Sequence, residues 1–179
     1  MSLKRIVITG GPGTGKTSII DELIKRNYTC LEEISRQVTI DAQQKGISQL
    51  FLTEPLLFSD LLLKGRIQQF HDAQNMEEIK VFFDRGIPDI VAYMDYAGIS
   101  YPKRFKIACQ DHIYDSIFIL APWQEIYISD NERYENFEQA MLIHDNLVSA
   151  YTTYGYKLYD VPFGPIKART EFILDTIST

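Results

Sequence analysis

The sequence predicts an α/β protein with three layers, in which helices cover both faces of a five-stranded parallel sheet. Short apolar segments alternate along the chain with longer segments of helical periodicity, which is the pattern of repeated βαβ units. The first apolar segment leads directly into a glycine-rich stretch, residues 10–17, and then into a helical pattern. No repeat or linker interrupts the alternation, so residues 1–179 are expected to form one domain.

The strands and helices are expected in a regular order. Continuous apolar or aromatic segments, typical of parallel strands buried on both faces, occupy residues 5–9, 29–32, 80–84, 116–120 and 157–161. Helical patterns occupy residues 18–24, 33–45, 53–74, 88–97, 102–110, 137–151 and 166–177. Prolines at the start and glycines after the end mark several of these helices.

The segment between the second and third strands, about residues 33–79, is expected to be a helical insertion. Its longer helix, 53–74, carries apolar residues around much of its circumference. Such a helix is buried either between other elements of the domain, which we favour, or in the interface of a homodimer.

The glycine-rich stretch matches the phosphate-binding pattern G-x-x-x-x-G-K-[ST] at every fixed position. Glycines let backbone N–H groups surround an anion, and the N-terminus of the following helix adds a positive dipole end. Lys16 is expected to reach the β- and γ-phosphates, and the Thr17 hydroxyl to hold Mg²⁺. The alternative is a glycine-rich turn that binds nothing. The sequence predicts triphosphate binding by Gly10, Gly11, Pro12, Gly13, Thr14, Gly15, Lys16, Thr17 and Ser18.

The third strand ends in an acid and an arginine. Asp84 is expected to hold the Mg²⁺ shell, because parallel sheets bind ligands outside the carboxyl ends of their strands. The alternative is an aspartate that caps the following loop. Arg85 offers a fork of donors suited to phosphate, with a surface ion pair as the alternative.

A second group of charged residues follows the second strand. Glu33 and Arg36 are three residues apart, so they share a face of the expected helix. A carboxylate there can act as general base toward an acceptor hydroxyl. A surface ion pair between the two residues explains the same spacing.

A charged, apolar-poor stretch follows the fourth strand and is expected to form a lid, at about residues 129–138. Arg133 in this stretch is suited to neutralising charge on a transferring phosphoryl group. The alternative is the solvated start of a helix.

Composition limits the partners. A net charge of −6 argues against a general nucleic-acid binder, which needs a basic face. No apolar run has the length of a membrane span, and the first expected strand begins too early to leave room for a signal peptide. We therefore expect a cytoplasmic protein that binds neither membranes nor nucleic acid.

The ordered set GGPGTGKT, Glu33-x-x-Arg36, FFDRGIPD, YISDNER and YGYKLYDVP resembles the small AAA-type ATPase domains of the NadR/TRPL-translocation-defect group, which includes ribosylnicotinamide kinase domains. The resemblance implies a phosphate-loop NTPase with the kinase-like strand order 2-3-1-4-5, a short lid and an adenine slot near Pro162 and Phe163. It also implies an acceptor side formed by Glu33, Arg36, Arg85 and Asp89.

The leading interpretation is an ATP- and Mg²⁺-dependent phosphotransferase with a small nucleoside- or nucleotide-like acceptor. Its catalytic residues are expected to be Lys16, Glu33, Asp84 and Arg133, and its metal ligands Thr17 and Asp84. The alternative is an ATP- or GTP-binding NTPase or regulatory module without a small-molecule acceptor. The chain has no N-K-x-D segment for recognising guanine.

Overall fold

The computed structural model describes residues 2–127 and 136–178. Its strands form one all-parallel sheet in the order β2-β3-β1-β4-β5, which confirms the predicted order. The strands are β1 (Lys4–Gly10), β2 (Thr29–Leu31), β3 (Lys80–Asp84), β4 (Ser116–Leu120) and β5 (Leu158–Asp160).

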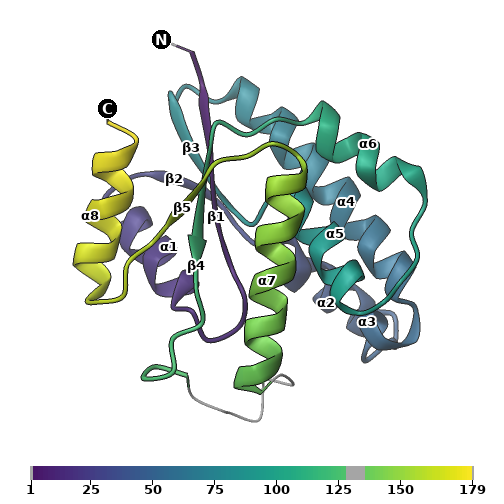
Figure 1. The fold of residues 1–179 in the computed structure, drawn as a ribbon. Helices are drawn as coiled ribbons and strands as arrows, with labels where there is room; N and C mark the ends of the chain where they lie inside the picture. The colour runs from purple at the N-terminus through teal and green to yellow at the C-terminus, as the bar shows by residue number, and fades with distance from the viewer. Residues whose placement is uncertain (1, 128–135, 179) are drawn as a thin grey trace.

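Helices flank the sheet on both sides, as Figure 1 shows. In chain order they are α1 (Lys16–Lys25), α2 (Ile34–Gln44), α3 (Leu50–Thr53), α4 (Pro55–Asp72), the 3₁₀ helix η1 (Ala73–Asn75), α5 (Ile87–Tyr96), α6 (Lys103–Asp111), α7 (Phe137–Thr153) and α8 (Ile166–Thr176). One layer consists of α1 and α8, and the opposite layer contains α4, α5, α6 and α7.

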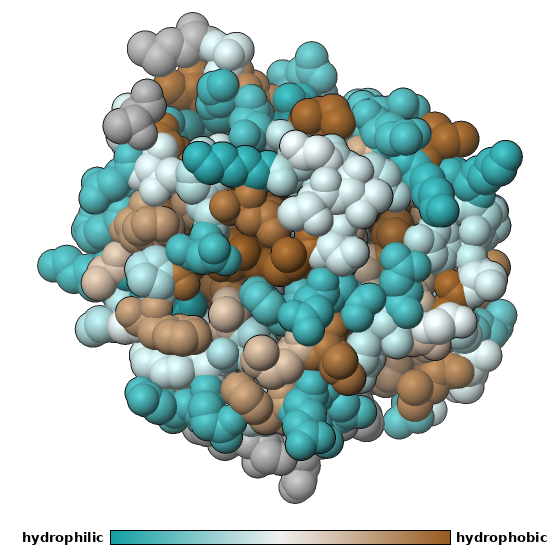
Figure 2. All heavy atoms as spheres, in the orientation of Figure 1, coloured by the Kyte–Doolittle hydropathy of each residue, from teal (hydrophilic) through white to brown (hydrophobic). Residues whose placement is uncertain are grey.

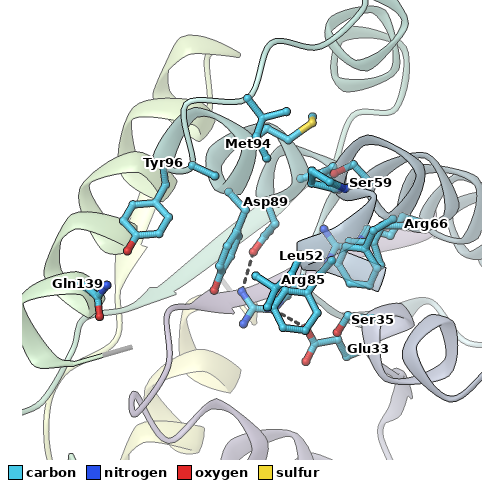
Figure 3. A pocket seen from close by; sticks show the side chains of 18 residues that line it. Glu33, Ser35, Leu52, Ser59, Arg66, Arg85, Asp89, Met94, Tyr96 and Gln139 are labelled. Carbon is cyan, nitrogen blue, oxygen red and sulfur yellow. Dashed lines mark hydrogen bonds and ion pairs between the residues drawn. The ribbon is translucent and has the colours of Figure 1, made fainter. Parts of the chain in front are cut away.

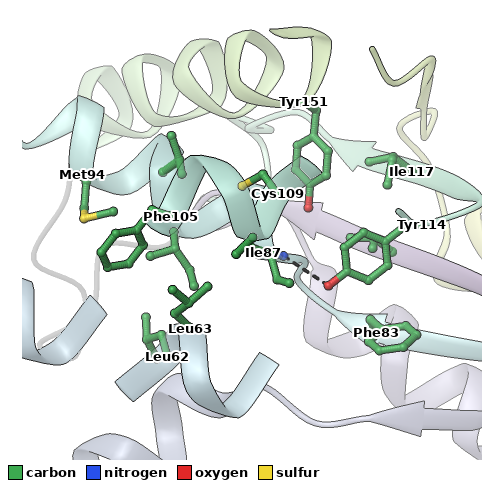
Figure 4. Close-up of a cluster of buried hydrophobic side chains, with 14 of the residues drawn as sticks. Leu62, Leu63, Phe83, Ile87, Met94, Phe105, Cys109, Tyr114, Ile117 and Tyr151 are labelled. Carbon is green, nitrogen blue, oxygen red and sulfur yellow. Dashed lines mark hydrogen bonds between the residues drawn. The ribbon is translucent and has the colours of Figure 1, made fainter. Parts of the chain in front are cut away.

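The alternation of side chains along β1 produces these layers. Ile6 and Ile8 pack on the α1/α8 side, whereas Val7 belongs to the cluster beneath α4 and α5. All three side chains are buried, as expected for a strand covered on both faces. In the cluster that contains Val7, Tyr151 lies toward Ile87 at the start of α5, and Phe105 lies beside Met94 near its end (Figure 4).

The helical insertion differs in detail from the prediction. A single helix over 53–74 was expected, but the structure has α3, a break at Glu54 and then α4. Glu54 has φ −138° and ψ 66°, outside the helical region that a residue before proline avoids. The helix α4 is half buried: Leu62 and Leu63 are in the core, while Leu57 and Leu61 are exposed.

In Figure 2 hydrophobic residues occur among hydrophilic ones on the visible face. No helix in the described part of the chain is long and apolar enough to cross a membrane.

Candidate active site

The candidate site lies where the carboxyl ends of neighbouring strands meet. In the sheet register Ile8 pairs with Asp84, and Gly10 pairs with Leu120. The phosphate loop, residues 10–17, therefore begins two residues after the β1 position that pairs with the last residue of β3. This edge is where parallel α/β sheets bind ligands.

Two positions in the phosphate loop require glycine. Gly13 has φ 71°, and a Cβ there would lie 2.3 Å from the Tyr127 ring. Gly15 has φ 80° and is the N-cap of α1, with no side chain capping the helix. The first N–H groups of α1 consequently remain available at the loop, the arrangement that binds anions.

Lys16 is directed from the first turn of α1 toward the acids of the site. Its side chain is 7 % exposed and donates to Asp84 Oδ1, while Glu33 Oε2 lies 3.7 Å from Nζ. The predicted loop lysine and the predicted metal-binding acid are thus direct neighbours. A bound triphosphate would compete with Asp84 for this ammonium group.

Glu33 and Arg85 form the next ion pair, which the sequence did not predict. Arg85 Nε donates to Glu33 Oε1 at 2.7 Å, and Arg85 has a positive φ of 73°, unusual for a residue with a side chain. Burial opposes ionisation of Glu33, but Arg85 and then Lys16 hold the pKa of its carboxyl well below the usual range. Glu33 is therefore an ionised acceptor for hydrogen bonds at neutral pH.

Asp89 is the buried centre of this hydrogen-bond network. It accepts from Thr9 Oγ1 at 2.5 Å, from Tyr151 Oη at 2.5 Å and from the Gly86 N–H at 2.9 Å. Arg85 Nη1 lies 3.1 Å from the same carboxylate. With these partners Asp89 orients Arg85 and caps α5. The expected contact of Asp89 with an acceptor stays a prediction.

A cavity of about 460 Å³ opens beside this network. Its walls are mainly apolar and aromatic and come from α3, α4 and α5; they include Phe51, Phe58, Ile90, Tyr93 and Met94. At its polar end Arg85 lies between Glu33 and Asp89 (Figure 3). The volume falls in the range of small-molecule sites, about 300–1,000 Å³.

Arg66 of α4 is a second guanidinium of this cavity, and the sequence reasoning missed it. It is 3 % exposed, and its Nη1 donates to the Gly86 carbonyl at 2.6 Å. Its Nε has no hydrogen-bond partner among the described residues. The available signal was a charged residue four positions after Leu62 and four before Phe70, on a helix face that is otherwise apolar.

The remaining predicted residues are placed as follows. Arg36 is exposed on α2 and does not form the alternative surface pair with Glu33, because Glu33 stands at the N-cap position before that helix and contacts Arg85. Pro162 and Phe163 lie in the loop before α8, where Phe163 stacks on Trp123 with ring centroids 5.2 Å apart. Arg133 lies outside the described residues.

The expected lid also lies mostly outside the described residues. Its last positions are described: Asn136 caps α7, and Phe137 and Glu138 begin that helix.

The donor set fits Mg²⁺. The exposed Thr17 hydroxyl stands in the first turn of α1, and the Asp84 carboxylate ends β3. Mg²⁺ in nucleotide sites takes one or two protein oxygens and completes its shell with phosphates and water. No group of three or more His, Cys, Asp or Glu residues in the described ranges forms a separate metal site.

Solved structures share this fold. Deoxyadenosine kinase from M. mycoides, solved with dCMP and dCDP, matches with a TM-score of 0.73 and 17 % identity over 97 % of this chain and 98 % of that chain. Thymidylate kinase from Ehrlichia chaffeensis matches with a TM-score of 0.66 and 13 % identity over 99 % of this chain and 100 % of its own.

NadR in complex with NR gives a TM-score of 0.72 and 17 % identity over 98 % of this chain. This chain covers 50 % of the NadR chain. At these identities the likeness establishes the fold, and the activities named belong to those proteins.

Sequence comparison gives the family. No curated protein matches the chain significantly. A family model described as an AAA domain matches residues 5–169, from β1 into α8. The resemblance to the small AAA-type ATPases is thereby confirmed, and the protein belongs to this family of AAA domains.

Proposed function

We propose that the protein is an ATP- and Mg²⁺-dependent phosphotransferase whose acceptor is a small nucleoside-like molecule. The observation that carries this proposal is the joining of two sites by one ion-pair chain. Lys16 of the phosphate loop contacts Asp84 and Glu33, and Glu33 contacts Arg85 at the polar end of the cavity. A phosphate donor and an acceptor bound at these two places would meet at Glu33.

In the donor half, the loop amides and Lys16 hold the phosphates. Thr17 and Asp84 would hold Mg²⁺, which would neutralise negative charge on the bound phosphates. The predicted role of Arg133 is to close over the transferring group. The stacked pair Trp123 and Phe163 supports an adenine slot near the final loop.

In the acceptor half, Glu33 accepts a hydrogen bond from the attacking hydroxyl. Its lowered pKa makes it an orienting group that is ionised throughout the neutral range. Arg85 fixes the carboxylate from the other side.

The charges that line the cavity favour an uncharged acceptor. Two acids, Glu33 and Asp89, stand opposite two arginines, Arg66 and Arg85. A phosphomonoester would add about two negative charges, with no further arginine or lysine among the described lining residues. A nucleoside adds none, so we expect nucleosides to be phosphorylated in preference to nucleoside monophosphates.

An acceptor screen tests the proposal. ADP release from Mg·ATP is measured with nucleosides and with the matching monophosphates, and product formation is checked by mass spectrometry. The expected result is acceptor-dependent ADP release with at least one nucleoside. ATP binding without turnover on any acceptor would contradict the proposal and support the NTPase or regulatory alternative.

A further inference from the structure

Arg169 of α8 is a buried guanidinium that contacts the phosphate loop. It is 2 % exposed, and its Nη1 donates to the Thr14 carbonyl at 3.0 Å. Its Nε donates to the Pro162 carbonyl at 3.1 Å. One planar side chain thus joins the phosphate loop to the loop after β5.

The phosphate loop and Arg169 fit each other closely. A Cβ at Gly15 would lie 2.8 Å from Arg169 Nη1, so a side chain there would have to displace the guanidinium as well as adopt the positive φ. The bond to Thr14 turns that carbonyl toward α8. A carbonyl oxygen held there cannot point at bound phosphates, which it would repel.

Among the described residues, no carboxylate balances the charge of Arg169. Its Nη2 has no hydrogen-bond partner, and no carboxylate of the described residues lies within 4.0 Å of the guanidinium. Burial lowers its pKa from the ordinary value. Buried charges are usually paired, so an unpaired one behind a phosphate loop indicates that the missing partner is a bound anion.

Arg169 also lies beside an aromatic pair formed by Trp123, in the segment after β4, and Phe163, in the loop before α8. Its guanidinium carbon is 5.9 Å from the centroid of the Trp123 ring, and Trp123 stacks on Phe163 at an interplanar angle of 25°. The two loops that the donor would touch are therefore held by the same residue.

We propose that Arg169 is a positioning residue for the phosphate donor: it keeps the phosphate loop in its anion-binding conformation and supplies positive charge behind it. This proposal rests on the proposed function insofar as the loop must bind a polyphosphate. It does not depend on the identity of the acceptor.

The test uses Arg169→Lys, which keeps the charge but cannot bond two carbonyls with one planar group. Affinity is measured by calorimetry for Mg·ATP and for tripolyphosphate, which has no base or sugar and so reports on the loop alone. We expect both affinities to fall about tenfold, about 1.4 kcal/mol. Amide exchange in the loop of the nucleotide-free variant should increase. Lys167→Ala, an exposed change on the same helix, is the matched control.

Tripolyphosphate affinity within twofold of wild type in folded Arg169→Lys would overturn the proposal. A loss of affinity for ATP but not for tripolyphosphate would also overturn it, because Arg169 would then act through Trp123 and Phe163 on the base and not through the phosphate loop. Arg169→Gln is the second variant, under the same criteria, if Arg169→Lys does not fold. Failure of both variants to fold would make Arg169 a stability residue and also overturn the proposal. Failure of the wild type to bind either ligand would instead count against the proposed function.

Discussion

At the scale of single residues, Lys16 is the group on which the donor half depends most. Its buried ammonium lies against Asp84 and near Glu33, where a triphosphate would take over one of these contacts. Lys16→Ala is expected to weaken triphosphate binding or turnover at least tenfold, about 1.4 kcal/mol or more. The measurement is Mg·ATP affinity by calorimetry together with the steady-state rate. Wild-type values in this variant would remove Lys16 from the site, and Lys25→Ala at the end of the same helix is the control.

Glu33 gives a prediction for pH. A depressed pKa in the folded state means that the ionised carboxylate stabilises the protein above its unfolded pKa, about 4.3. This contribution is lost as the pH falls toward the lower folded pKa. Glu33→Gln should therefore be less stable than wild type near neutral pH, and the difference should shrink below about pH 4.

Urea unfolding of both proteins across this range measures the difference, with the exposed neighbour Glu32→Gln as control for removing one carboxylate. A difference that stays constant down to about pH 3 would show that Glu33 is not stabilised in its ionised form.

At the scale of elements, the N-terminus of α7 is fixed by a reciprocal cap. Asn136 Oδ1 accepts from the Gln139 N–H at 2.9 Å, and Gln139 Oε1 accepts from the Asn136 N–H at 2.8 Å. Asn136→Ala should cost about 1 kcal/mol of unfolding free energy, because the helix loses its side-chain cap. Urea unfolding measures it, and Asp145→Ala on the exposed face of α7 is the control. A loss below about 0.3 kcal/mol would show that the cap contributes little.

The elements themselves were largely predictable. Continuous apolar strands and the strand–glycine–helix pattern depend on local periodicity and on backbone freedom, which neighbouring residues encode. The expected helix over 53–74 was wrong at its start, where Glu54 breaks α3 from α4. A residue before proline disfavours the helical region, which is a local rule. The apolar residues keep a helical periodicity across this position, so the periodicity alone does not reveal the break.

At the scale of the whole molecule, the cavity depends on packing between the helical insertion and α5. Ser59 of α4 is buried and lines the cavity. Ser59→Leu should fill space there and raise the acceptor KM at least tenfold, while the affinity for Mg·ATP stays within about twofold. Lys64→Leu, which adds the same side chain on the exposed face of α4, is the control.

Acceptor kinetics at fixed Mg·ATP, together with calorimetry for the donor, test this prediction. An unchanged acceptor KM would place the acceptor outside the cavity. Equal losses for donor and acceptor would point instead to a general disturbance of the fold.

The sequence by itself determined the phosphate loop, the parallel sheet, its strand order through the family resemblance, and the acids and arginines at the strand ends. These features are set by short-range pattern and by the rule that parallel strands end at one edge. The tertiary structure decided the partners: Glu33 with Arg85 rather than Arg36, Asp89 with Tyr151, and Arg169 with Thr14. Such pairs join residues far apart in the chain, so only the pairing of β2 with β3 and the packing of α5, α7 and α8 against the sheet specify them.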